Sequence, residues 1–453
     1  MIMNENNNTK KQIRKAAVIV GDKIAETVYD PVLKKTQFAT FVDGKVEYKE
    51  AVVTNGEDVY PLDAKNDIVD KQVVLLPSKA VEYGTETELI QEIQTFIHKY
   101  LDITPMFERI AAYYAMFSWL YDRFNEVPYL RAIGDFGSGK TRFLQVIGSI
   151  CYRPVCMGGA TTPSPIFRIL NELKGTLVLD EADFKSSEMS DDIVKILNSG
   201  YQRGIPVLRS EGKGVFEVKA YDVFSPKVIA TRETFNDKAL ESRFLVEEMG
   251  HGTLRTDIPR RLSDEFYEES RGIRNKLLMW RFRNFNKLLV FDDAPLEGIH
   301  PRLHQIIIPL LTIIESEEMK TSLKEFVQKY NQELIADRGM SWESDIIFAI
   351  LKMEREKKID SMTVKEITDS VNNEMDLSDE TLQTRKVGWI LRARLQLKTY
   401  KTRKGYTLSL SKNKDKLVFW KERYGITEAD LSGECVNDVN VVETPIETAN
   451  IGF

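Results

Sequence analysis

The chain has few residues of the kinds that build disulfide frameworks and zinc centres. Its 453 residues include three cysteines (Cys151, Cys156 and Cys435) and four histidines. The cysteines form no CxxC pair, and no histidine is grouped with them at the spacing of zinc ligands. These shortages argue against a disulfide scaffold and a structural zinc site, and they indicate reduced thiols in a cytoplasmic protein.

Long apolar segments and an excess of basic charge are also absent. The first fourteen residues are polar, so we expect no signal peptide. The most apolar segment, residues 103–124, carries Glu108, Arg109, Asp122 and Arg123, which a membrane span tolerates poorly. The net charge of −6 excludes attraction of nucleic acid by the chain as a whole. We therefore expect a soluble cytoplasmic protein without a membrane partner, in which any nucleic-acid surface is local.

The length and the residue patterns predict several domains. The composition, 42% hydrophobic and 29% charged, is typical of globular proteins. Residues 37–42 and 45–48 are short β-forming runs joined by Asp43-Gly44, a hairpin signal. From Glu86 to Phe124 the apolar spacing is helical, and beyond it strands and helices alternate. The expected parts are a small β-rich domain at 1–85, a helical linker region at 86–127, an α/β core at 128–250, a helical lid at 251–340, a C-terminal domain at 341–424 and a disordered acidic tail at 425–453.

One segment matches the demanding pattern G-x-x-x-x-G-K-[ST]. It reads Gly134-Asp135-Phe136-Gly137-Ser138-Gly139-Lys140-Thr141 and lies between a possible strand at 129–133 and a possible helix at 142–147. The glycines let backbone N–H groups point at phosphate oxygens, and the helix N-terminus adds its positive end. Lys140 would reach the β- and γ-phosphates, and the Thr141 hydroxyl would bind Mg²⁺. The segment therefore predicts a phosphate-binding loop for ATP.

A second segment supplies carboxylates of the kind that such a loop requires. The apolar run 176–179 ends in Asp180-Glu181. A buried strand that delivers two carboxylates at its carboxyl end gives Asp180 as a metal ligand and Glu181 as the base that activates water. The alternative is a strand that ends in an ordinary acidic loop. Glu181 after Asp180 favours hydrolysis of the nucleotide over phosphoryl transfer to a small acceptor.

Two further features resemble ATPases of the AAA+ class, and in particular minichromosome-maintenance-like replicative helicases of plasmids, phages and mobile elements. Strand 227–230 ends in Thr231, where this class carries the polar sensor 1 residue that orients water. Ser242-Arg243-Phe244 resembles the arginine-finger segment of these helicases. The resemblance covers roughly residues 128–410. It implies a homo-oligomer, most simply a hexameric ring, in which Arg243 enters the neighbouring subunit's site. From the residues alone, Arg243 could also be a surface or salt-bridged arginine.

The same resemblance directs attention to a lid arginine and to a hairpin. In this class a sensor 2 arginine lies at the start of a lid helix. Arg302 is the candidate for this residue, with Arg274 as the alternative. Residues 205–209 and 215–219 flank Glu211-Gly212-Lys213-Gly214, which predicts a β-hairpin with a basic tip. Similar hairpins grip DNA in translocating relatives, so Lys213 and Arg209 are candidate DNA contacts. The alternative is an ordinary surface hairpin whose glycines only make the turn.

The C-terminal domain predicts a winged helix, because three helical segments precede two strands. Thr363 is the expected N-cap of the second helix, and residues 381–395 form the third. No Asp or Glu interrupts the basic residues of the third helix and the wing, which are Arg385, Lys386, Arg392, Arg394, Lys398, Lys401, Arg403 and Lys404. This local concentration predicts contacts with nucleic-acid phosphates. A basic face that docks a protein is the alternative.

The sequence thus predicts a Mg²⁺-ATP-dependent, ring-forming DNA helicase or translocase. It would act on single-stranded or forked DNA in the replication of a mobile element, phage or plasmid. The first alternative is an ATP-switched initiator, helicase loader or transposition regulator without unwinding activity. The second is a protein remodeller, in which the C-terminal domain docks a partner.

Overall fold

A computed structural model describes most of the chain and divides it into two compact units. The units are Met1–Val327 and Gln328–Phe453, and their boundary lies within helix α10 (Glu317–Gly339). The residues that the structure describes are 12–158, 161, 163–180, 187–211, 217–235, 237–250, 255–287, 289, 291, 296, 299–339, 342–374 and 382–432.

A five-stranded parallel sheet forms the centre of the first unit, with the strand order β14-β8-β13-β10-β9. The strands are β8 (Tyr129–Ile133), β9 (Val155–Met157), β10 (Leu177–Leu179), β13 (Lys227–Thr231) and β14 (Phe244–Glu248). All residues of β10 and β13 are buried, as expected for parallel strands covered on both faces. The predicted α/β core is therefore confirmed as a parallel sheet with helices.

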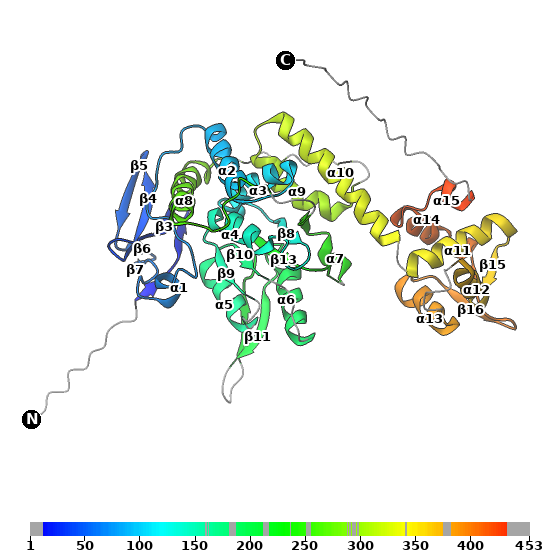
Figure 1. Ribbon diagram of the computed structural model, residues 1–453. Helices are drawn as coiled ribbons and strands as arrows, with labels where there is room; N and C mark the ends of the chain where they lie inside the picture. Colours follow the sequence, from blue (N-terminus) through cyan, green and yellow to red (C-terminus); the bar gives the residue numbers. More distant parts are fainter. Residues whose placement is uncertain are drawn as a thin grey trace, which may run out of the picture. The chain divides into compact units, whose positions relative to one another are not determined.

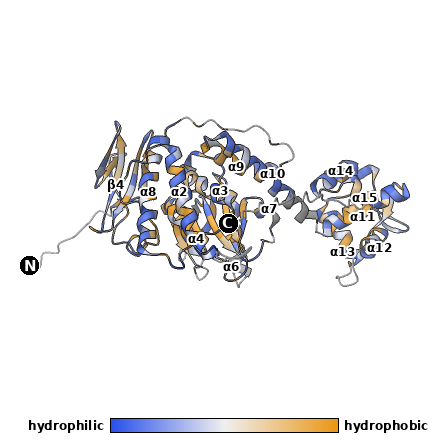
Figure 2. Cartoon of the chain, turned by 45° about the horizontal axis from the view of Figure 1, so that its top comes forward, coloured by the Kyte–Doolittle hydropathy of each residue, from blue (hydrophilic) through white to orange (hydrophobic). Residues whose placement is uncertain are grey.

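Helices alternate with these strands along the chain, which makes the parallel order possible. They are α4 (Lys140–Ile150), α5 (Pro163–Leu173), α6 (Ser187–Ser199) and the short α7 (Lys238–Glu241) (Figure 1). The antiparallel pair β11 (Val207–Glu211) and β12 (Glu217–Tyr221) is inserted directly before β13. Figure 2 shows hydrophobic residues in α4 beside the sheet, where Phe143, Leu144 and Ile147 are buried.

The N-terminal part of this unit is a β structure. An antiparallel sheet has the order β2-β3-β4-β5, and a smaller one has the order β1-β7-β6, followed by helix α1 (Asp67–Asp70). Asp43 and Gly44 adopt φ values of 49° and 77° between β4 and β5, so the hairpin signal is confirmed. The strands are β1 (Ile13–Arg14), β2 (Ala17–Val20), β3 (Lys23–Asp30), β4 (Lys35–Val42), β5 (Lys45–Lys49), β6 (Val52–Thr54) and β7 (Glu57–Tyr60).

The helical region after residue 85 is interrupted, whereas its apolar spacing predicted helix as far as Phe124. Helix α2 (Glu86–Tyr100) ends before Leu101, α3 (Pro105–Ser118) begins at a proline, and the 3-10 turn η1 (Tyr121–Arg123) follows. Thr104 is extended because the residue before a proline avoids the helical conformation. Two later helices, α8 (Asp264–Asn284) and α9 (Pro301–Ile313), complete the unit together with the start of α10. No helix among the described residues is both long and apolar enough to cross a membrane.

A buried ionic cluster joins the N-terminal sheet to the core. Glu26 of β3 is only 2% exposed and accepts hydrogen bonds from Tyr152 (3.0 Å), Arg153 and Arg281 (2.8 Å). The Arg281 guanidinium of α8 is fully buried and also binds Asp122 at 2.6 and 2.9 Å. Two carboxylates and two guanidiniums thus balance in charge, which offsets the high cost of burying each one alone. The cluster fixes β3, η1 and α8 against one another.

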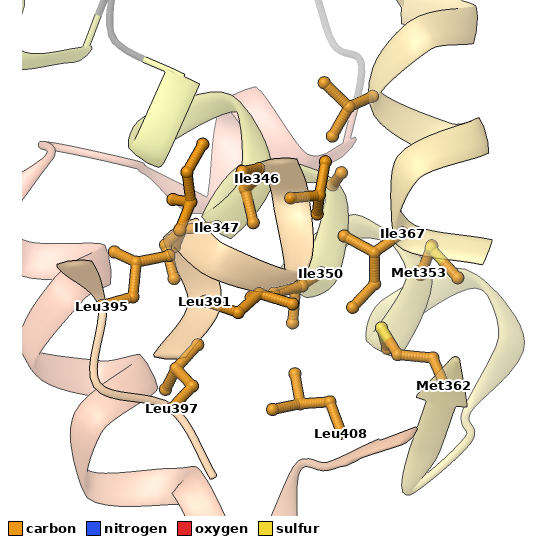
Figure 3. Packing of buried hydrophobic residues seen from close by; sticks show 14 of the residues in the cluster. Ile346, Ile347, Ile350, Met353, Met362, Ile367, Leu391, Leu395, Leu397 and Leu408 are labelled. Atoms are coloured by element: carbon orange, nitrogen blue, oxygen red, sulfur yellow. The ribbon is translucent and has the colours of Figure 1, made fainter. Parts of the chain in front are cut away.

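The second unit combines helices with a small antiparallel sheet of order β15-β17-β16. Ile346, Ile350, Ile367, Leu391 and Leu408 meet in its core (Figure 3). Thr363 exchanges hydrogen bonds with Glu366, so it caps the second helix as predicted. The elements are α11 (Trp342–Lys357), β15 (Ser361–Thr363), α12 (Val364–Glu374), α13 (Thr384–Trp389), the π-helical turn η2 (Ile390–Arg394), β16 (Thr399–Thr402), β17 (Gly405–Ser409), η3 (Ser411–Asn413), α14 (Lys414–Arg423) and α15 (Glu428–Ser432).

The packed core of this unit includes residues beyond the predicted start of the acidic tail at residue 425. Helix α15 follows that point, and Ile426 and Leu431 are buried in the same core as α11. The acidic composition concealed these two apolar contacts. Residues 433–453 lie outside the described residues.

Replacing Glu26 by Ala should lower the free energy of unfolding by about 3–5 kcal/mol, because it leaves two guanidiniums buried with only one carboxylate. Urea denaturation followed by circular dichroism measures this loss. Glu47→Ala is the matched control, since Glu47 lies in the same sheet and its pair with Lys49 is half exposed. Equal unfolding midpoints for the two variants would show that the cluster contributes no specific stability.

Candidate functional site

The glycine-rich segment forms a tight loop between β8 and α4, as its sequence predicts. Gly137 and Gly139 have φ values of 80° and 97°, a region that side chains rarely adopt. Gly134 is closely packed, because a Cβ atom there would lie 2.6 Å from the Met249 carbonyl oxygen. No side chain caps the start of α4, so the helix N-terminus and its positive dipole end face the loop. The backbone therefore has the geometry of an anion-binding loop.

The functional side chains of this loop lie near its own carbonyl groups and near the end of strand β10. Lys140 Nζ donates to the carbonyl oxygens of Gly134 (2.6 Å) and Asp135 (2.7 Å), so the ammonium group is held over the loop. The Thr141 hydroxyl donates to Asp180 Oδ2 at 3.1 Å. The two residues predicted to share a metal ion, Thr141 and Asp180, are therefore in direct contact. Glu181 lies outside the described residues.

Two hydroxyl groups near the loop have no partner among the described residues. Thr231 ends β13, which pairs with β8, and its main-chain oxygen accepts from the Gly134 N–H at 3.3 Å. The Thr231 hydroxyl is buried without a hydrogen bond, and so is the hydroxyl of Ser138. A buried polar group without a partner is costly. Both groups would be satisfied by a polar ligand or water at the loop, which fits the sensor position predicted for Thr231.

A cavity of about 870 Å³ opens beside the loop, and part of its wall comes from residues that the sequence patterns did not indicate. Glu247 of β14 accepts from the Thr104 N–H (2.6 Å) and hydroxyl (2.9 Å), which holds the α2–α3 connection at the cavity. Arg232 also lines the cavity. Its position directly after Thr231 is the sequence feature that could have pointed to it. The lining residues are Asp102, Ile103, Thr104, Ile133, Gly134, Asp135, Phe136, Gly137, Ser138, Gly139, Arg232, Glu247, Glu248, Met249 and Gly250.

The residues present fit a nucleotide with its magnesium ion. The cavity has the size of a small-molecule site, and the loop provides N–H groups and one lysine for phosphates. Mg²⁺ in such sites takes one or two protein oxygens, with water and phosphate oxygens as its other ligands. Thr141 and Asp180 supply that set. Among the described residues no group of three or more His, Cys, Asp or Glu could form a metal centre made of protein ligands alone.

Arg243 lies far from the loop of its own chain. It directly precedes β14, and its carbonyl oxygen accepts from the Tyr129 N–H at the start of β8. The loop follows the opposite end of β8, five residues away, which corresponds to roughly 16 Å at about 3.3 Å per residue. The Arg243 guanidinium is buried over the Tyr201 ring at 4.3 Å and binds Asn198. Burial and the nearby Arg302 lower the pKa of Arg243.

Neither candidate sensor 2 arginine lines the cavity. Arg302, at the start of α9, lies 6.0 Å from the Tyr201 ring and therefore beside Arg243. Arg274 is buried in α8 and donates to the Ser149 carbonyl oxygen at 2.5 Å, near the end of α4. Burial, with a contribution from Arg271, lowers the Arg274 pKa to about 9. Arg302 therefore lies beside Arg243, the arginine-finger candidate, whereas Arg274 packs against the end of α4.

The predicted hairpin is present, but its basic tip is outside the described residues. β11 and β12 pair antiparallel, whereas residues 212–216, including Lys213, are not described. Arg209 is held within the fold, because it pairs with Asp192 of α6 at 2.7 Å and stacks on Phe167 at 4.8 Å. A contact between Arg209 and DNA would require this pair to open.

The basic residues of the second unit lie together, as the sequence predicts. They occupy α13, η2, the connection that follows η2 and the β16–β17 hairpin, and all of them are exposed. The set comprises Arg385, Lys386, Arg392, Arg394, Lys398, Lys401, Arg403 and Lys404. These residues give the second unit a local concentration of positive charge.

Asp180→Asn should raise the Mg²⁺ concentration needed for nucleotide binding by at least about tenfold, because a neutral amide is a poor ligand for Mg²⁺. Titration of a fluorescent ADP analogue at several Mg²⁺ concentrations, and in excess EDTA, measures the change. Asp222→Asn is the control, since Asp222 pairs with Lys174 rather than with Thr141. An unchanged Mg²⁺ requirement in Asp180→Asn would remove Asp180 from the metal site.

Comparison with known proteins gives only distant likenesses. No protein-family model and no curated protein matches the chain. The solved structure of the NrS-1 C-terminal region is 12% identical, with a TM-score of 0.34 over 85% of this chain and 96% of that chain. The structure described as the active helicase SCCmec type IV Cch is 11% identical, with a TM-score of 0.39 over 89% and 99%. JCV helicase is 14% identical, with a TM-score of 0.26 over 54% and 66%. Since these scores are below 0.5, the function must be inferred from the site itself.

Proposed function

We propose that the chain is a Mg²⁺-dependent ATP hydrolase of the AAA+ class that acts on DNA. The observation that carries this proposal is the contact between Thr141 and Asp180, next to a lysine held over a glycine-rich loop. Loop and carboxylate both follow the carboxyl ends of parallel strands, where open α/β sheets bind their ligands. β13 separates β8 from β10 and carries Thr231 to the same edge.

Each residue has a distinct role in this proposal. The loop N–H groups hold the phosphates, and Lys140 leaves its carbonyl partners to contact the β- and γ-phosphates. Thr141 and Asp180 hold Mg²⁺, which neutralises charge on the phosphate oxygens when bound. Thr231 orients the attacking water, and Glu181 accepts its proton. The rest of the nucleotide would lie in the cavity, against the wall formed by residues 102–104 and 249–250.

The position of Arg243 supports a site that two subunits complete. Roughly 16 Å of sheet separates Arg243 from its own loop, which is farther than an arginine side chain can bridge. An arginine at the amino edge of β14 can instead act in the site of a neighbouring copy, where its guanidinium would stabilise charge on the γ-phosphate. We propose a ring, most simply a hexamer, because repeated head-to-tail contacts close by rotation. Arg302, beside Arg243, belongs to the same edge.

Mixing two inactive variants tests this shared site. Lys140→Ala should lack nucleotide binding, and Arg243→Ala should lower kcat by about a thousandfold while nucleotide affinity remains. An equimolar mixture should recover about a quarter of the wild-type rate, because random assembly places an intact loop beside an intact arginine in one interface of four. Steady-state phosphate release measures the recovery.

Arg283→Ala is the matched control for the mixing experiment. Arg283 is an arginine of the first unit that pairs with Glu82 at the surface, so its removal should leave the rate unchanged. Mixed subunits that stay inactive, or an Arg243→Ala chain that hydrolyses ATP normally, would contradict an arginine supplied by a neighbour.

DNA is the proposed substrate because the second unit presents a basic face on a helix and hairpin of winged-helix order. The chain would then be a helicase or translocase of a mobile element, phage or plasmid. The ATP-switched initiator or loader is the rival, since it uses the same site without unwinding.

Two assays separate these functions: ATPase rate with and without single-stranded DNA, and strand displacement from a forked duplex. We expect stimulation by DNA together with unwinding that Glu181→Gln abolishes. Stimulation without unwinding would favour the initiator or loader. An ATPase rate indifferent to DNA would instead favour a protein remodeller.

A further inference from the structure

The basic face of the second unit contains aromatic rings that phosphate binding does not require. Between Leu382 and Asn413 the chain has no Asp or Glu. None of the basic residues in this stretch forms an ion pair with a carboxylate that the structure describes. Trp389 and Tyr406 are 53% and 51% exposed within the same stretch. Aromatic rings that are exposed among cations are a feature of surfaces that bind single-stranded nucleic acid.

The two rings are held in place by neighbouring guanidiniums. The Arg394 guanidinium lies 5.6 Å from the Trp389 ring centroid, and that of Arg392 lies 5.2 Å from the Tyr406 ring. A cation above one side of a ring stabilises its orientation. About half of each residue remains accessible, which leaves ring surface open to a further stacking partner.

A π-helical turn creates the Trp389–Arg394 contact. Residues five apart are not neighbours on an α-helix, where side chains three and four apart meet. The turn η2 has the wider hydrogen bond, in which the Leu395 N–H donates to the Ile390 carbonyl oxygen at 2.9 Å. Such turns are rare and often lie at functional sites. Its inward residues fill the core, since Leu391 and Leu395 point into the cluster of Figure 3.

The hairpin register brings Tyr406 to the same surface. Lys401 and Tyr406 are directly paired and therefore share one face of the β16–β17 hairpin. Arg392 connects this face to the helix, because its guanidinium contacts Tyr406 and packs beside Gly388, the residue before Trp389. Tyr400 pairs with Thr407 and belongs to the opposite face, where Lys412 covers it at 4.5 Å. Arg392 thus bridges Tyr406 and the helical segment that carries Trp389. We name Trp389 and Tyr406, together with Arg392, Arg394 and Lys401, the stacking face.

We propose that the stacking face binds single-stranded nucleic acid by stacking unpaired bases on Trp389 and Tyr406, while Arg392, Arg394 and Lys401 contact phosphates. This inference depends on the proposed action on DNA and specifies which strand form the second unit recognises. Bases in a duplex are already stacked on each other and leave no ring surface for these side chains. Alternation of aromatic and basic groups is the arrangement that tracks single strands. Phosphate contacts alone would need only the cations.

Equilibrium binding to the full-length chain tests the proposal. The probes are a fluorescently labelled single strand of thymidines and a labelled duplex of the same length, each titrated at several salt concentrations. Trp389→Ala and Tyr406→Ala should each weaken single-strand binding by roughly tenfold, the order of one lost stacked base, without changing the salt slope. Lys401→Ala should lower that slope by about one phosphate. Trp389→Phe should retain most of the affinity, because it keeps a ring.

Tyr400→Ala is the matched control. It removes a tyrosine with its own cation from the other face of the same hairpin, so single-strand affinity should stay at the wild-type value. Circular dichroism and the thermal midpoint of each variant show whether a loss of binding reflects unfolding.

Three results would overturn the proposal. The first is wild-type single-strand affinity in Trp389→Ala and Tyr406→Ala, which would assign the rings to a protein partner. The second is an equal loss of affinity for the single strand and for the duplex in these variants. The third is a loss of single-strand affinity in Tyr400→Ala as large as that in Tyr406→Ala. Failure of the proposed ATPase function can be distinguished from failure of the stacking face. In that case the chain would not hydrolyse ATP, but its binding of single-stranded DNA would still depend on Trp389.

Discussion

Parallel pairing of β8, β13 and β10 is the constraint on which the candidate site depends. The carboxyl ends of parallel strands all lie at one edge of the sheet. Residues that follow these strands are therefore neighbours in space, although they are far apart in the sequence. The glycine-rich loop follows β8, Thr231 ends β13 and Asp180 follows β10. The contact between Thr141 and Asp180 bridges 39 residues of sequence and results from this register. A shift of one residue in any of these strands would turn its functional side chain to the other face of the sheet.

The same pairing separates Arg243 from the loop. β14 pairs with β8 in parallel, so the residue before β14 must lie at the amino edge. An arginine there cannot serve its own phosphates, whatever rotamer it adopts. In the proposed ring the fold would relate hydrolysis to assembly, because the glycine-rich loop lies at one edge of the sheet and Arg243 and Arg302 lie at the opposite edge. Both guanidiniums lie against the ring of Tyr201, in the segment that follows α6.

In the second unit, a local irregularity of the helix determines which side chains lie next to each other. Along α13 and η2, Val387, Ile390 and Leu391 are buried in the core, whereas the arginines and Lys386 are exposed. The π-helical turn shifts this pattern by one residue, which aligns Arg394 with Trp389. One local irregularity thus places a cation beside an aromatic ring on a basic helix, which is the arrangement that the proposed recognition of bases requires.

The sequence by itself determined the phosphate loop, the acidic strand end, the β-hairpin at Asp43-Gly44 and the cap at Thr363, because each depends on residues within one turn or one motif. The α2–α3 break is also local, but helical spacing hid the effect of Pro105. Only the tertiary structure decided the rest. It placed Arg302 beside Arg243, bound Arg209 to Asp192, brought residues 102–104 to the cavity and buried Glu26 among arginines. These are contacts between elements distant in sequence, and strand order, burial and charge pairing fix them without any local pattern.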